Sequence, residues 1–156
     1  NRNRAQGADC EPGVCCLDHV CGGSPCQSDS DCSAQETCGD YFPAVPPLEM
    51  NEVARVAARL HSLDMAEQNF FEHDNLEGLD PFERMENAGY QGADPWGENI
   101  QAGSGTGADA VASLMTSPGH CRNIMDPEYG VIGLGYAYSD TSDYGHYWTQ
   151  CFGGGH

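Results

Sequence analysis

A histidine at the start of a short expected helix is well placed to do chemistry. In the sequence SPGH, Ser117 can cap the helix, Pro118 takes its first position, and His120 falls in the first turn. The positive end of the helix dipole favours a neutral imidazole, which is the form that binds a metal or acts as a general base. The same pattern also fits a structural histidine hydrogen-bonded to a loop, so His120 alone leaves both interpretations open.

Two further side chains could join such a site. Glu98, in WGENI, lies where a strand is expected to begin, and His73, in FFEH, lies at or just past the end of a long helix. A lone glutamate at a strand edge is usually solvated. The segment HDNLEGLD, from His73 to Asp80, is rich in oxygen ligands but lacks the spacing and the closing glutamate of a calcium loop, so calcium is less favoured. The chain contains no H-E-x-x-H motif, no G-x-S-x-G nucleophile elbow and no phosphate-binding loop.

Hydrophobic spacing and capping signals predict the helices that must position these residues. Apolar residues at helical intervals predict a helix from about Met50 to Asn69. Asp80 as N-cap, followed by Pro81 and Glu83, predicts a second helix that stops at Gly89. A third helix is expected from Thr106, and the short one with His120 is the fourth.

The expected strands are fewer and lie mostly near the end of the sequence. The segment ENIQAG is a short candidate, and Val131–Ser139 and His146–Phe152 form a candidate hairpin with a long polar loop. Gly133 and Gly135 leave one face of the first hairpin strand nearly bare, which lets a helix approach its backbone closely. A small sheet covered by helices follows, an α+β fold of the αβα-sandwich type.

The charge of the chain restricts its partners. The sequence of 156 residues has 24 acidic residues and 6 basic ones, all arginine, and its formal net charge is -18. Such a surface repels nucleic acid and anionic lipid, so neither is an expected partner. Cations are the natural partners.

The cysteines indicate an exported protein with a crosslinked segment of its own. Of nine cysteines, seven lie within residues 1–40: Cys10, Cys15, Cys16, Cys21, Cys26, Cys32 and Cys38. Their spacing contains no C-x2-C pair, so disulfides are favoured over zinc, and disulfides persist in oxidising, extracellular or periplasmic compartments. We expect a disulfide-rich irregular segment over residues 1–40 and a folded domain over residues 41–156. No apolar stretch is long enough to span a bilayer and no targeting signal is visible, so we expect any signal to have been removed.

Four ordered motifs resemble a known family. LHSLDMAEQNFFEHDNLEGLDPFERMENAGY, WGENIQAG, SPGHCRNIMDPEYGVIGLGYA and YWTQCFG are similar in order and spacing to the bacterial SCP-like branch of the CAP superfamily, which comprises cysteine-rich secretory, antigen 5 and pathogenesis-related 1 proteins. The resemblance covers roughly residues 46–153. It implies an αβα sandwich with a small central antiparallel sheet and an extracellular location.

The resemblance also implies a cleft that can hold a divalent cation, often zinc. Residue by residue, it assigns His73, His120 and Glu98 as the ligands, with Glu98 as the base if the protein is a metal-assisted hydrolase. The second acid of the family's cleft falls on Ser117, which is a departure from the pattern. His61 lies on the long helix near the cleft, where core packing is the favoured interpretation.

The same resemblance places Cys121 and Cys151 on neighbouring elements, so we expect them to form a disulfide. Seven cysteines then remain, an odd number, and one is free, pairs with the folded domain or bridges to another molecule. Three functions are compatible with these expectations. They are an extracellular binding module for a small-molecule, lipid or cell-envelope ligand, a peptidase-like metal-assisted hydrolase, and an envelope-associated assembly protein with an idle cleft.

Overall fold

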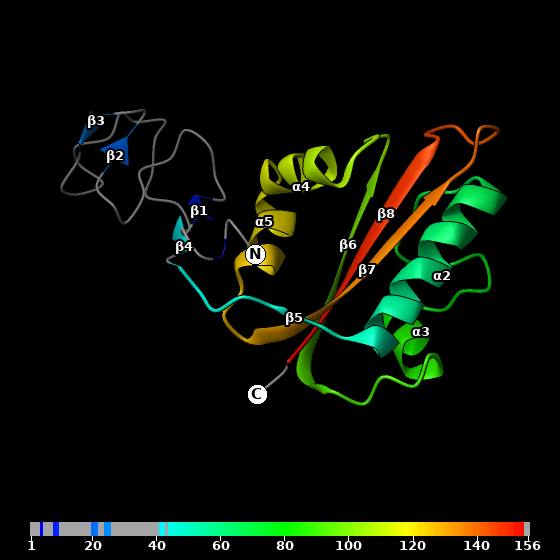
Figure 1. Ribbon diagram of the computed structural model, residues 1–156, viewed down its shortest axis with the longest axis horizontal. Helices are drawn as coiled ribbons and strands as arrows, with labels where there is room; N and C mark the ends of the chain where they lie inside the picture. The colour runs from blue at the N-terminus through cyan, green and yellow to red at the C-terminus, as the bar shows by residue number, and fades with distance from the viewer. Residues whose placement is uncertain are drawn as a thin grey trace. The chain divides into compact units, whose positions relative to one another are not determined.

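The computed structural model describes residues 44–154 in full, together with Arg4 and four two-residue strands. These strands form two antiparallel ribbons, β1 (Ala8–Asp9) with β4 (Tyr41–Phe42), and β2 (Val20–Cys21) with β3 (Ser24–Pro25). The chain divides into two compact units, and each is described by itself (Figure 1). Unit 1 comprises Asn1–Pro46 and Met115–Asp126, and unit 2 comprises Pro47–Leu114 and Pro127–His156.

Unit 2 is built on a four-stranded sheet in the order β5-β7-β8-β6. Its strands are β5 (Glu49–Met50), β6 (Ala93–Ala102), β7 (Tyr129–Tyr138) and β8 (His146–Gly154). The three long strands pair antiparallel, and the short β5 joins the edge of β7 in parallel. The α+β fold and the expected hairpin are confirmed, whereas no pattern in the sequence predicted β5.

The long helix α2 (Glu52–Gln68) begins and ends by local chemistry. The Asn51 side chain accepts hydrogen bonds from the backbone N–H groups of Val53 and Ala54, both at 3.0 Å. At the other end, Asn69 adopts a left-handed conformation with φ 54°, which closes the helix. The observed helix is therefore slightly shorter than the predicted segment from Met50 to Asn69.

The next helix, α3 (Pro81–Asn87), confirms the predicted capping box. The Asp80 side chain accepts from the Glu83 N–H at 2.8 Å, and the Glu83 carboxylate accepts from the Asp80 N–H at 3.0 Å. Pro81 occupies the first helical position. This cap fixes where α3 begins, and α3 carries a residue of the site described below.

Helix α2 packs against the bare face of β7. A Cβ atom added to Gly133 would lie 2.2 Å from the carbonyl carbon of Ala54, and one added to Gly135 would lie 2.1 Å from the carbonyl oxygen of Ala58. The helix therefore approaches the strand backbone to backbone, as the two glycines predict. The Ser62 and Thr149 hydroxyls are hydrogen-bonded at 2.8 Å across this buried interface.

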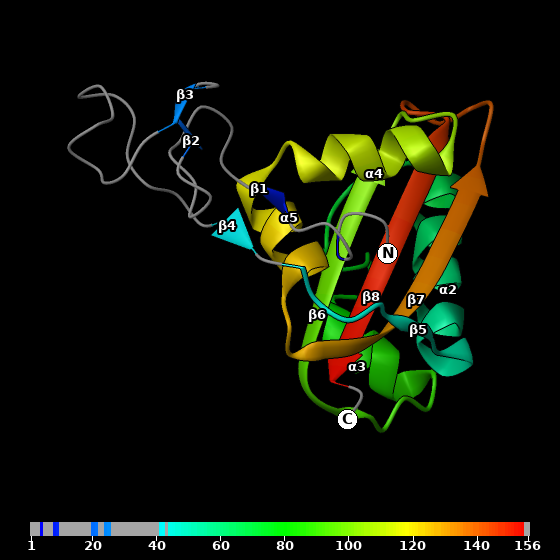
Figure 2. The same ribbon diagram turned by 60° about the vertical axis from the view of Figure 1, so that its left-hand side comes forward.

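Helix α4 (Gly107–Met115) covers the opposite face of the sheet, as Figure 2 shows with α2 behind the strands and α4 in front of them. A Cβ atom added to Gly107 would lie 3.5 Å from the indole ring of Trp148. Thr106 accepts a hydrogen bond from the Asp109 N–H at 3.2 Å and begins the helix where predicted. These helices and the sheet form the layers of the predicted sandwich.

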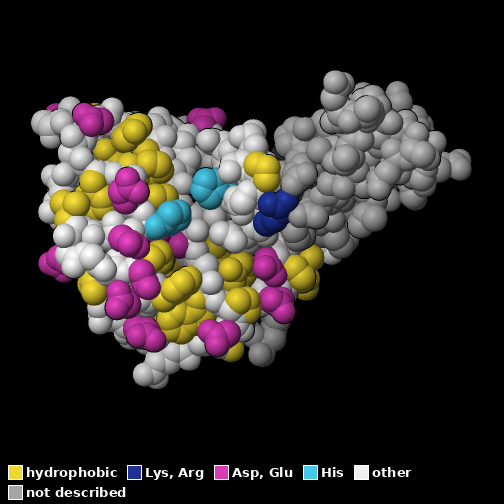
Figure 3. Space-filling model, turned by 180° about the vertical axis from the view of Figure 1, so that it is seen from behind, with side chains coloured by type: hydrophobic (Ala, Val, Ile, Leu, Met, Phe, Trp, Pro, Cys, Tyr) yellow, Lys and Arg dark blue, Asp and Glu magenta, His cyan; other side chains and the backbone are white. Residues whose placement is uncertain are grey.

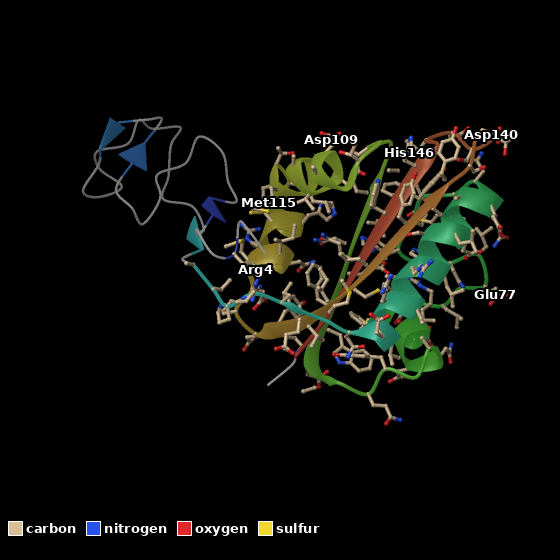
Figure 4. All side chains as sticks on the ribbon, in the orientation of Figure 1. Arg4, Glu77, Asp109, Met115, Asp140 and His146 are labelled. Atoms are coloured by element: carbon tan, nitrogen blue, oxygen red, sulfur yellow. The ribbon has the colours of Figure 1, made fainter. Side chains whose placement is uncertain are left out.

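In unit 1, the short helix α5 (Pro118–Met125) carries His120. Ser117 stands at its N-cap and Pro118 at its first position, but the Ser117 side chain makes no capping hydrogen bond, so that part of the prediction is wrong. Arg4 lies against the end of this helix (Figure 4), where its guanidinium donates to the Ile124 and Asp126 carbonyls at 3.0 and 2.8 Å. None of the helices in residues 44–154 is long and apolar enough to cross a membrane.

Candidate functional site

A buried carboxylate on the sheet is the centre of the site. Glu98 lies on β6, on the face that α2 covers, and its side chain is 2% exposed. One oxygen, Oε1, accepts from His73 Nδ1 at 3.0 Å, and the other, Oε2, accepts from Arg84 Nη2 at 2.7 Å. The Cys151 thiol, on the adjacent strand, donates a weak hydrogen bond to Oε2 at 4.0 Å. Both oxygens of this buried carboxylate therefore accept hydrogen bonds from neighbouring side chains.

Arg84 connects Glu98 to the loop before α3. Its Nη1 donates to the backbone carbonyls of His73 at 2.6 Å and Leu79 at 2.8 Å, while Nη2 binds Glu98. The Arg84 side chain is 10% exposed and that of Glu98 is 2% exposed, so the bond between these two side chains is largely shielded from water. Arg84 was missed at the sequence level, although it is the one basic residue between Asp80 and Gly105.

His73 is the accessible member of this group. Its side chain is 49% exposed, and the hydrogen bond to Glu98 raises the pKa of the imidazole, while partial burial opposes the rise. The bond also fixes which ring nitrogen faces the carboxylate. An imidazole oriented by a buried carboxylate is the arrangement that a general base requires.

His61 is close to this group but differs in state. It is 1% exposed, and its Nε2 donates to the Glu72 carbonyl at 3.1 Å, while its Nδ1 has no hydrogen-bond partner. Burial lowers the pKa of His61, and the Phe70 ring packs edge-on against it at 6.0 Å. His61 is therefore a neutral imidazole in the wall of the site.

A groove of about 380 Å³ runs along α2 beside these residues. Its walls combine apolar and acidic side chains, among them Leu60, Leu63, Leu79, Asp64, Glu67 and Glu77. His61 and Arg84 also line it, so the groove is continuous with the buried ion pair. Figure 3 shows a face of the molecule on which acidic side chains surround hydrophobic patches, and Figure 4 places Glu77 at the outer edge of the loop beside α2.

Comparisons with known proteins identify the family and the fold of the chain. The family model of the cysteine-rich secretory protein family, CAP, matches residues 44–152. The chain belongs to this family. The CAP domain is 38% identical over 108 residues to the uncharacterized protein YkwD of Bacillus subtilis (strain 168), a match that covers 68% of this chain and 39% of that relative. The chain therefore spans well under half the length of this curated relative.

Solved structures show the same CAP fold. An extracellular protein with an SCP domain from Bacillus anthracis str. Ames matches with a TM-score of 0.62 at 25% identity, over 71% of this chain and 35% of that one. An outer surface protein of Borrelia burgdorferi matches with a TM-score of 0.62 at 19% identity, over 70% of this chain and 79% of that one. The likeness to the Borrelia protein supports the fold alone.

Of the ligands expected for a metal in the CAP cleft, the structure brings His73 and Glu98 together in unit 2. His120 and Ser117 belong to unit 1. Among residues 44–154 and the other described positions, no group of three or more His, Cys, Asp or Glu side chains is arranged to hold a metal ion. Glu98 does not fit as a zinc ligand, because the Arg84 guanidinium supplies the positive charge beside it and both carboxylate oxygens have donors.

The calcium alternative is disfavoured by the loop itself. The Asn75 side-chain oxygen accepts from the backbone N–H groups of Glu77 at 3.1 Å and Leu79 at 2.8 Å. This oxygen therefore stabilises a turn in the segment between His73 and Asp80.

The cysteines of the CAP domain do not pair as expected. Cys151 is a free thiol with 1% exposure, and burial together with Glu98 raises its pKa. The predicted Cys121–Cys151 disulfide is therefore wrong. Cys151 faces α2 within the core, against Ala54 and Met85, whereas Cys121 is buried in unit 1 and is disulfide-bonded. The side chains of the predicted framework from Cys10 to Cys38 lie outside the described part of the chain, although the backbone of Cys21 is described in β2.

Proposed function

We propose that this CAP-domain protein is a secreted, extracellular binding module whose ligand occupies the groove along α2. The observation that carries the proposal is the groove itself, in which apolar walls from Leu60, Leu63 and Leu79 lead to the Arg84–Glu98 ion pair. A concave site with apolar walls and a few fixed polar groups is the usual form of a small-molecule site. An amphiphilic ligand from a lipid or cell-envelope source fits these walls.

The extracellular location is supported by the solved structures of similar fold, since one belongs to an extracellular protein and another to an outer surface protein. A resident zinc ion is not part of the proposal, because Arg84 already neutralises Glu98. The groove binds its ligand through apolar contact and hydrogen bonds.

The test uses decyl maltoside below its micelle concentration, an uncharged amphiphile that the acidic surface does not repel. Leu60 and Leu63 are 59% and 43% exposed, so changing both to Gln leaves the core intact. We expect this double variant to bind the probe at least about tenfold more weakly than the unchanged protein in ligand-observed NMR. Leu134→Gln, at a leucine 42% exposed outside the groove, is the matched control. Equal binding by all three proteins would refute the groove as the site.

Hydrolysis is a second candidate, and the His73–Glu98 pair favours it. The carboxylate orients the half-exposed imidazole as in a general-base pair, with no metal required. We expect hydrolysis of a peptide library to be lost in His73→Asn and retained in Ser117→Ala. Activity that survives His73→Asn would exclude this role for the pair.

Assembly through a spare cysteine is the third alternative, and cysteine counting disfavours it. Cys121 is disulfide-bonded and Cys151 is free, so we infer that Cys121 pairs with one of the seven cysteines between Cys10 and Cys38. The remaining six are then an even number. Non-reducing electrophoresis checks this inference, because a monomer is expected with and without reductant.

A further inference from the structure

A second cavity lies away from the groove, between α3 and the start of β6. It has a volume of about 550 Å³ and is lined by Phe82, Glu86, Asp94, Pro95 and Trp96, which together are called the aromatic pocket below. None of these residues lines the groove along α2 or contacts Glu98 through a hydrogen bond described above. The aromatic pocket therefore requires its own explanation.

The tryptophan in the aromatic pocket is held in place by its surroundings. Trp96 Nε1 donates to the Gly92 and Ala93 carbonyls, both at 3.1 Å. Its ring packs against Tyr90 at 5.1 Å in an edge-to-face arrangement. The indole is thus an ordered wall whose ring electrons present a negative face.

An exposed phenylalanine also lines the aromatic pocket. Phe82 is 44% exposed on the first turn of α3, although an aromatic ring of this size is usually buried. Glu86 lies four residues further along α3 and so shares the Phe82 face of the helix. Aromatic walls and a carboxylate therefore meet at one opening.

Both charged side chains of the aromatic pocket are acidic. Glu86 and Asp94 are exposed and no basic residue lines the cavity. The arginine of α3, Arg84, is bound to Glu98 instead. The cavity is thus negative in charge and apolar in its walls, in a chain of net charge -18.

We propose that the aromatic pocket binds a quaternary ammonium group. The charged nitrogen of such a cation carries four alkyl groups and no hydrogen, so it can contact Phe82, Pro95 and Trp96 without leaving an N–H donor unpaired. Its charge is attracted by the aromatic faces and by the two carboxylates. A lysine ammonium is more strongly hydrated, so bringing it against the apolar surfaces of Phe82, Pro95 and Trp96 costs more desolvation.

The test compares choline with 3,3-dimethylbutan-1-ol, its neutral isostere. The chain has two tryptophans, so Trp148 serves as an internal control for Trp96 in the indole N–H region of an ¹H–¹⁵N NMR spectrum, with Trp148→Phe for assignment. At constant ionic strength, we expect choline to shift the Trp96 signal saturably and to bind about three- to tenfold tighter than the isostere. Equal affinity of the two compounds, or an equal shift of Trp148, would overturn the proposal.

Charge variants distinguish choline binding in the aromatic pocket from the nonspecific attraction of a cation to the acidic protein. Glu86→Gln with Asp94→Asn is expected to weaken choline binding about threefold or more. Glu49→Gln with Asp140→Asn removes the same charge from exposed positions elsewhere and is expected to leave the affinity unchanged within about twofold. Equal weakening by both pairs would refute the site. Tighter binding of N-acetyl-lysine methylamide than of choline would refute the quaternary ammonium and indicate a basic protein partner instead.

Discussion

Replacing Arg84 by Met should destabilise the protein strongly. The Glu98 carboxylate is 2% exposed and Arg84 is 10% exposed, so the substitution leaves a buried negative charge without its cation. Removing one partner of a buried ion pair costs about 3–5 kcal/mol. The two carbonyls that Arg84 also binds can turn to water, so they add little to this value.

The assay is urea unfolding followed by tryptophan fluorescence at pH 7. Arg55→Met is the matched control, since Arg55 and Glu52 form an ion pair at 3.1 Å with side chains 41% and 74% exposed. That surface pair is expected to contribute about 0–1 kcal/mol. If Arg84→Met lowers the free energy of unfolding no more than Arg55→Met does, the buried ion pair is not the element that stabilises this region.

A double-mutant cycle identifies the cause of the loss. Glu98→Gln removes the buried charge, so the double variant with Arg84→Met should be more stable than Arg84→Met alone. We expect a coupling energy of about 1–3 kcal/mol between the two positions. Additive effects would show that Arg84 acts through packing or through its carbonyl bonds.

Three further predictions concern the other parts of unit 2. Glu98 raises the pKa of His73 above its ordinary value of 6.5, so this pair stabilises the fold fully below pH 6.5, and the contribution is lost as the pH rises through the raised pKa. NMR titration should show that the pKa of His73 is lower in Glu98→Gln than in the unchanged protein. An unchanged pKa would contradict the pairing. Gly133→Ala places a methyl group 2.2 Å from the Ala54 backbone and should cost at least about 1–3 kcal/mol in urea unfolding, whereas a neutral result would mean that α2 can move away. Asn51→Ala removes the cap of α2 and should cost about 0.5–2 kcal/mol, with Asn51→Ser restoring most of it; a Ser variant as unstable as the Ala variant would exclude capping as the cause.

The parts of the fold that could be predicted are those with local signals. The capping box of α3 involves residues three apart, and the Gly133–Gly135 spacing marks the face of β7 that a helix covers. The hairpin of β7 and β8 follows from alternation and a polar loop. The short strand β5 was missed because two residues carry no periodicity.

The sequence predicted individual residues of the site but not the contacts between them. The resemblance placed His73 and Glu98 in one cleft as metal ligands, but their direct hydrogen bond was not predicted. Arg84 was missed because it binds Glu98 from 14 residues away, a distance that no local pattern reports. The same limit explains the wrong disulfide. The number of cysteines suggested a pair, but it does not show on which face of the sheet Cys151 lies. That face decides whether another cysteine sulfur can reach the Cys151 thiol.

The buried thiol of Cys151 can report when helix α2 separates from the sheet. Its sulfur lies under α2 and beside Glu98, so an alkylating reagent reaches it only when helix and sheet separate. The rate of modification at high reagent concentration therefore measures how often this interface opens, without any introduced label. A ligand that binds the groove along α2 should slow this modification, and a ligand of the aromatic pocket should slow it only to the extent that it stabilises the whole fold.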